Sequence, residues 1–190
     1  MPRLLKLVAA AFVATLLAPA VPAIAKLNVV ASFSIVADIV GRVGGDRIEL
    51  IPLVGPGGDA HVFSPSPRDI AKVAAADLFV VNGLGFEGWI ERIVEASGTK
   101  AKVVFAAERV PAVRSDPDQR GGIDPHAWQS AANVVLYVVT VERALCAADP
   151  AGCAEYASNA AAYSNELTAL DAEVRRVIAT IPAAKRKVIT

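Results

Sequence analysis

The sequence predicts an α/β fold: an open, mostly parallel sheet flanked by helices and followed by one long helix. Three observations predict it, namely short runs rich in Val, Ile and Leu, helical spacing of apolar residues between those runs, and one long apolar stripe of helical period near the carboxyl end. The chain carries 19 Lys plus Arg against 19 Asp plus Glu and is 54% hydrophobic, which argues against a disordered or nucleic-acid-binding protein.

Four apolar runs have the length and composition of buried strands. They are 27–31, 48–53, 78–81 and 102–105. Apolar residues at helical spacing separate the first run from the second and the second from the third; these are Ile35, Ile39, Val40 and Val43, then Ile70, Val73 and Ala74. Strands that alternate with helices in this way form parallel βαβ units covered on both faces.

Capping residues mark where the helices begin. Ser66-Pro67-Arg68-Asp69 combines an N-cap residue, a proline in the first turn and an early acid. Asp124-Pro125 predicts a second helix that runs to about residue 147, and Asp149-Pro150 predicts a third. The apolar stripe of this third helix continues to Ile181, which gives a length of about 48 Å.

A helix of that length is long enough to link two lobes, so four parts are predicted. They are a signal peptide (1–25), an N-terminal α/β lobe (26–148), a linking helix (149–182) and the start of a second, missing lobe (183–190). The alternative is that 187–190, which has the composition of a strand, closes the first sheet.

The amino terminus predicts export. Arg3 and Lys6 precede an apolar stretch (7–17), and Ala23-Ile24-Ala25 is a cleavage signal, so we expect a cleaved signal peptide and a periplasmic protein. An uncleaved membrane anchor is the alternative, although prolines interrupt the apolar stretch. No other stretch is expected to be long and apolar enough to span a bilayer.

The two cysteines, Cys146 and Cys153, are seven positions apart. In an oxidising compartment such a pair predicts a disulfide, which would stabilise the fold by about 2–3 kcal/mol. Two buried free thiols are the alternative.

The chain has two histidines, His61 and His126, and each lies in a Gly-, Pro- or Asp-rich junction. Ligands bind where parallel strands end, and both junctions can face that edge of the sheet. We therefore expect a transition-metal site, with Asp59 and Asp124 as the carboxylates that orient the second ring nitrogens. Two imidazoles are an incomplete site, and ordinary surface or core histidines are the alternative.

Other polar and aromatic residues have simpler interpretations. Gly83-Leu84-Gly85 is expected to form a tight turn, and Trp89 and Trp128 are expected to pack. The charged residues at helical spacing, which are Glu87, Glu91, Arg92 and Glu95, predict a solvated helix face.

Three blocks of sequence resemble the metal-binding (zinc or manganese) solute-binding proteins of bacterial ABC importers. The blocks are Gly58-Asp59-Ala60-His61 with its continuation to Asp69, Asn82-Gly83-Leu84-Gly85-Phe86-Glu87-Gly88-Trp89, and Asp124-Pro125-His126-Ala127-Trp128. The resemblance extends from about residue 26 to residue 190.

The resemblance implies two α/β lobes joined by a long helix, with a metal site between the lobes to which His61 and His126 contribute. It implies a third ligand, His or Glu, just after a strand like 187–190, and a later acid. It also implies a non-catalytic, monomeric periplasmic receptor that captures Zn2+ or Mn2+ and delivers it to an inner-membrane ABC permease, without nucleic acid. Segment 106–123 contains no His, which favours manganese or a zinc protein without a His-rich loop.

Two other functions stay open. A secreted zinc-dependent hydrolase would need a third ligand and a general base, and neither His-Glu-x-x-His nor Gly-x-Ser-x-Gly occurs. An adhesive module with a structural metal is the second alternative.

Overall fold

The computed structural model describes residues 25–114 and 122–186. Its sheet has four parallel strands, β1 (Leu27–Phe33), β2 (Ile48–Val54), β3 (Leu78–Val81) and β4 (Lys102–Phe105), in the order β2-β1-β3-β4. The four predicted strands are confirmed, and β1 and β2 extend further at their carboxyl ends. Because all strands are parallel, the loops that follow them gather at one edge of the sheet.

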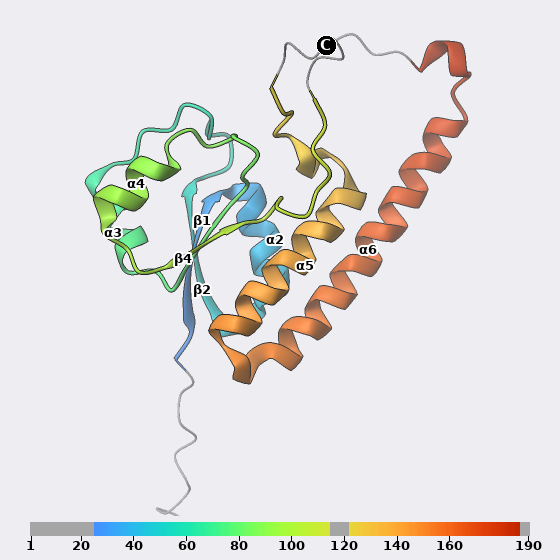
Figure 1. Cartoon of the computed structure of the whole chain (residues 1–190). Coiled ribbons are helices and arrows are strands. Elements are labelled where there is room, and N and C mark those ends of the chain that lie inside the picture. Colours follow the sequence, from blue (N-terminus) through green and yellow to red (C-terminus); the bar gives the residue numbers. More distant parts are fainter. Residues whose placement is uncertain (1–24, 115–121, 187–190) are drawn as a thin grey trace, which may run out of the picture.

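Helices cover both faces of the sheet (Figure 1). On one side lie α3 (Pro67–Ala74) and α4 (Ile90–Ser97); on the other lie α2 (Ser34–Gly44), α5 (Ala131–Ala148) and α6 (Cys153–Ala179). The N-cap residue predicted for α3 is confirmed, and it forms a capping box: the Ser66 side chain accepts from the Asp69 N–H and the Asp69 carboxylate accepts from the Ser66 N–H. The described residues also form short 3-10 turns. Three of them are η2 (Gly45–Arg47), η3 (Ala127–Gln129) and η5 (Ala183–Lys185), and a fourth, η4, precedes α6.

Helix α5 differs from the sequence prediction in two ways. It begins at Ala131 and not at Asp124-Pro125, because the Asp124 carboxylate bonds to His126 and the extended backbone of Ser130 separates η3 from the helix. It is also long and apolar enough to cross a membrane by length and composition, so the prediction that no such stretch exists is wrong. Its buried residues pack in the core, which accounts for that composition; they are Val134, Tyr137, Val138, Thr140, Val141, Ala144 and Leu145.

Helix α6 lies along α5, and its length of 27 residues corresponds to about 40 Å. The 3-10 turn η4 (Pro150–Gly152) precedes it, and the Asp149 carboxylate accepts from the Gly152 N–H, as its capping position predicts. A disulfide joins Cys146 of α5 to Cys153 of α6, as predicted. The second half of α6 exposes four large apolar side chains, which are Leu170, Val174, Val177 and Ile178, and Ile181, two residues beyond the end of the helix, is exposed as well.

Two predicted segments lie outside the described residues. They are the signal peptide, all but its last residue, and the strand at 187–190.

Candidate metal centre

The two histidines lie at the edge of the sheet where the strands end. His61 follows β2, His126 follows β4, and the segment from Asn82 to Trp89 follows β3 between them. Ligand sites of open parallel sheets occupy this edge, because loops from several strands converge there. The structure therefore brings together residues 65 positions apart in the sequence.

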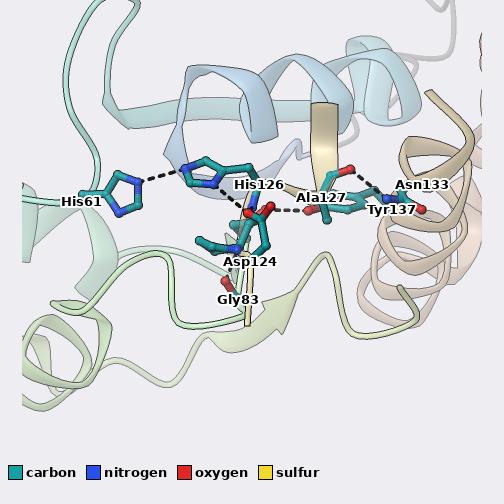
Figure 2. Close-up of polar contacts among 9 residues, drawn as sticks. His61, Gly83, Asp124, His126, Ala127, Asn133 and Tyr137 are labelled. Carbon is teal, nitrogen blue, oxygen red and sulfur yellow. Dashed lines mark hydrogen bonds and ion pairs between the residues drawn. The ribbon is translucent and has the colours of Figure 1, made fainter. Parts of the chain in front are cut away.

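The imidazoles of His61 and His126 face each other (Figure 2). Their Nε2 atoms are 3.2 Å apart, the ring centroids are 5.3 Å apart, and both residues are exposed. In a tetrahedral zinc site with Zn–N bonds of 2.0–2.1 Å, two nitrogens are separated by about 3.3–3.4 Å. The observed distance is close to that value, so the two nitrogens lie where one ion can contact both.

Asp124 holds the ring of His126. Its Oδ1 is 2.8 Å from His126 Nδ1 and also accepts from the His126 N–H at 3.0 Å. These hydrogen bonds, the backbone one foremost, lower the pKa of the Asp124 carboxyl. When Nδ1–H donates to the carboxylate, Nε2 keeps its lone pair for a metal, as in carboxylate–histidine–zinc arrangements.

Asp59 differs from the prediction. Its Oδ1 accepts from the backbone N–H of His61 at 2.9 Å, so the carboxylate shapes the loop and does not orient the ring. A carboxylate two residues before its partner reaches the backbone N–H readily, which is a common turn geometry.

Aromatic side chains form a floor beneath the histidines. The Phe86 ring is 4.2 Å from the His61 ring and 5.8 Å from the His126 ring, and Trp128 is 5.2 Å from His126, centroid to centroid. Phe33, at the end of β1, contacts both Phe86 and Trp128. Trp128 is thus a packing residue, as predicted, and the floor limits where the two imidazoles can move.

Trp89 fixes the backbone just before His61. Its Nε1–H donates to the Ala60 carbonyl at 2.7 Å, and both residues are buried. The indole packs as predicted, and it also ties the His61 loop to the segment between β3 and α4.

Glu87 is buried, so the prediction that it lies on a solvated helix face is wrong. It is 6% exposed, whereas Glu91, Arg92 and Glu95 lie on the solvated face as predicted. Its Oε1 accepts from the Ser32 hydroxyl at 2.6 Å and the Asn82 N–H at 2.7 Å, and its Oε2 accepts from the Gly83 N–H at 3.1 Å. Burial raises the pKa of the Glu87 carboxyl, and these three hydrogen bonds oppose that rise.

The turn that Glu87 stabilises is unusual in its backbone. Gly83, Leu84 and Gly85 all have positive φ, at 88°, 55° and 79°. Leu84 is the strained member, because a β-carbon disfavours this region. The predicted tight turn is confirmed.

No group of three or more His, Cys, Asp or Glu side chains that could hold a metal occurs within 25–114 and 122–186. The described chain therefore offers two imidazoles with one orienting carboxylate.

The chain is similar to several known proteins. Residues 29–190 match the family described as zinc-uptake complex component A, periplasmic (ZnuA). The chain is 35% identical over 165 residues to the iron-binding protein YfeA of Yersinia pestis, which covers 87% of this chain and 53% of that protein. It is 37% identical over 172 residues to the manganese ABC transporter substrate-binding lipoprotein PsaA of Streptococcus pneumoniae, covering 87% and 56%.

Solved structures are similar too. A Mn-bound periplasmic metal-binding protein from Candidatus Liberibacter asiaticus aligns with a TM-score of 0.78 and 28% identity, over 85% of this chain and 60% of that one. Zn(II)-bound AdcA from Streptococcus pneumoniae aligns with a TM-score of 0.70 and 29% identity, over 78% and 32%. The family consists of solute-binding proteins and not of enzymes. The chain belongs to the ZnuA family of metal-binding solute-binding proteins of ABC transporters, and it spans about half the length of the curated relatives it matches.

Proposed function

We propose that this protein captures Zn2+ or Mn2+ in the periplasm with the imidazoles of His61 and His126, and delivers the ion to an ABC permease of the inner membrane. The observation that carries the proposal is the 3.2 Å separation of the two Nε2 atoms. The family match supports capture for uptake, and the named relatives include binders of manganese, zinc and iron.

The donor set bears on the choice of ion. Imidazole suits zinc, whereas manganese prefers sites with more oxygen donors. Two imidazoles leave at least two positions for further ligands, and the identity of those ligands decides between zinc and manganese. Water can occupy these positions when only this chain is present, which would make the binding weak.

We also propose that α6 connects this lobe to a second lobe in the whole protein. The exposed apolar side chains near the end of α6 support it, since Leu170, Val174 and Ile178 share a hollow with Ile35 and Tyr163. A large exposed apolar patch is typical of a surface that another part of a protein covers. In this arrangement the histidines face the space between the lobes.

A titration of the chain with Zn2+ and Mn2+ tests the proposed ligands. His61 and His126 are the two histidines of the sequence, so their imidazole proton signals can be followed without overlap from others. We expect both rings to respond to one equivalent of Zn2+, and calorimetry to show at least tenfold weaker binding in His61→Ala and in His126→Ala. Glu91→Ala, an exposed residue of α4, is the control and should bind as the unaltered chain does.

The proposal is wrong if the double variant His61→Ala/His126→Ala binds Zn2+ as tightly as the unaltered chain. It is equally wrong if neither ring signal responds to millimolar Zn2+ or Mn2+.

A further inference from the structure

A buried polar network connects the sheet to the residue that precedes His126. Asn82, directly after β3, is fully buried. Its Nδ2 donates to the Pro125 carbonyl at 3.0 Å and to the Gly83 carbonyl at 2.9 Å, and its Oδ1 accepts from the Tyr137 hydroxyl at 2.6 Å. Figure 2 shows Gly83 and Tyr137 beside the Asp124–His126 turn.

These hydrogen bonds allow the Asn82 amide one orientation. Both amide hydrogens have carbonyl acceptors and the oxygen has a hydroxyl donor, so a flipped amide would set its oxygen against two carbonyls. Burial and the nearby Glu87 charge raise the pKa of the Tyr137 hydroxyl, so it keeps the proton that it donates. The Asn82 amide is therefore oriented jointly by the Tyr137 hydroxyl of α5 and by the two carbonyls to which it donates.

The backbone of Asn82 is also held in place, by Glu87. Its N–H donates to Glu87, which also accepts from Ser32 of β1 and from the Gly83 N–H. Strands β1 and β3 and helix α5 thus all hold this one residue. A buried network in which every member is satisfied is rigid.

We propose that Asn82 is a positioning residue that sets the place of His126 opposite His61. The inference rests on the proposed function, since it concerns how the two metal-binding imidazoles are held. Asp124 fixes the His126 ring within its own turn, whereas the bond from Asn82 to Pro125 ties that turn to the sheet. From the other side, Asn133 of α5 donates to the Ala127 carbonyl.

The position of the turn decides whether one ion can contact both nitrogens. Metal–nitrogen bonds tolerate deviations of about 0.2 Å, so a small shift of the turn costs affinity. Changes to residues that orient a ligand typically weaken metal binding by about 10–100-fold.

Two variants test the role of Asn82. Asn82→Asp keeps the size but loses at least one donor: an ionised Asp faces two carbonyls, and a protonated one serves a single carbonyl. Tyr137→Phe removes only the hydroxyl that orients the amide. The matched control is Tyr156→Phe, which removes a buried tyrosine hydroxyl that donates to Asp149 at the far end of α5.

Each variant is measured with and without Zn2+, at a temperature where circular dichroism shows it folded. We expect Asn82→Asp to weaken Zn2+ binding by about 10–100-fold, and Tyr137→Phe to weaken it several-fold. In the metal-free protein we expect both to reduce the nuclear Overhauser effect between the His61 and His126 rings. Tyr156→Phe should keep the unaltered affinity and ring contact.

The proposal is overturned if folded Asn82→Asp keeps the ring contact and binds Zn2+ within twofold of the unaltered chain. It is also overturned if Tyr156→Phe weakens binding as much as Tyr137→Phe, because loss of stability alone would then explain the effect. If Asn82→Asp does not fold, Tyr137→Phe decides the matter. If the unaltered chain binds no Zn2+, the proposed function fails, and the metal-free ring contact still tests the positioning.

Discussion

The hydrogen bond from Trp89 to Ala60 gives a sharp test of how the His61 loop is held. Trp89→Phe removes the indole N–H, which lies 2.7 Å from a carbonyl whose residue is 4% exposed. An unpaired buried acceptor costs about 1–3 kcal/mol, and the smaller ring leaves part of a fully packed site empty. We expect a total loss of roughly 2–4 kcal/mol in the free energy of unfolding, or roughly 4–16 °C in Tm.

Urea denaturation followed by circular dichroism measures that loss, and the imidazole signal of His61 reports the position of its loop. We expect the signal to shift in Trp89→Phe. Phe79→Leu, a buried aromatic residue of β3 with no polar group, is the control; it should lower stability and leave the His61 signal in place. A Trp89→Phe protein with stability unchanged to within about 0.5 kcal/mol and an unshifted His61 signal would refute the reasoning.

Three further predictions follow from other contacts. Asp124→Asn should weaken Zn2+ binding about 10-fold in calorimetry, because the amide no longer holds the neighbouring imidazole in the metal-binding tautomer; unchanged affinity would contradict this. Replacing both Cys146 and Cys153 by Ala should lower the unfolding free energy by about 2–3 kcal/mol in urea and leave both imidazole signals unchanged, and equal stability would contradict it. The pKa of the Asp149 carboxyl lies below its ordinary 3.8, foremost because Arg47 donates hydrogen bonds to it. The ionised carboxylate therefore stabilises the folded state above about pH 3.8, and this stabilisation is lost as the pH falls through the folded pKa. Thermal melts of Asp149→Asn should therefore show lower stability at pH 7 and a shallower decline below about pH 4 than the unaltered chain, and parallel curves would contradict it.

The strands could be predicted from their apolar runs, and the convergence of the two histidines followed from the parallel arrangement of those strands. Parallel strands place the loops after β2 and β4 at the same edge, so His61 and His126 could be assigned to one site without knowledge of side-chain positions. The family resemblance added the choice of Zn2+ or Mn2+ as the ion and the role in uptake. The disulfide could be predicted as well, because the spacing of Cys146 and Cys153 fits a short closed loop.

Burial of Glu87 could not be read from spacing. Glu87, Glu91 and Glu95 are four residues apart, which imitates one face of a helix, but α4 begins only at Ile90. Glu87 belongs to the preceding turn, where three donors turn it inward. The sequence signal for burial of Glu87 was an Asn followed by a Gly-rich turn and a Glu, since such a turn exposes backbone N–H groups to which a carboxylate can bond.

The start of α5 was mispredicted for a similar reason. Asp124-Pro125 has the composition of a helix start, but the carboxylate bonds to His126 instead of to a following helical turn. The local sequence is compatible with a helix start at Asp124 and with a turn in which Asp124 bonds to His126. Packing of this segment against Asn82 and the aromatic floor selects the turn.

X-ray absorption spectroscopy of the Zn2+-loaded chain tests the central claim most directly, because it counts the imidazoles bound to the ion. The two Nε2 atoms that lie 3.2 Å apart predict two imidazole nitrogens at about 2.0–2.1 Å from zinc. A spectrum with one imidazole, or none, would contradict the shared site of His61 and His126.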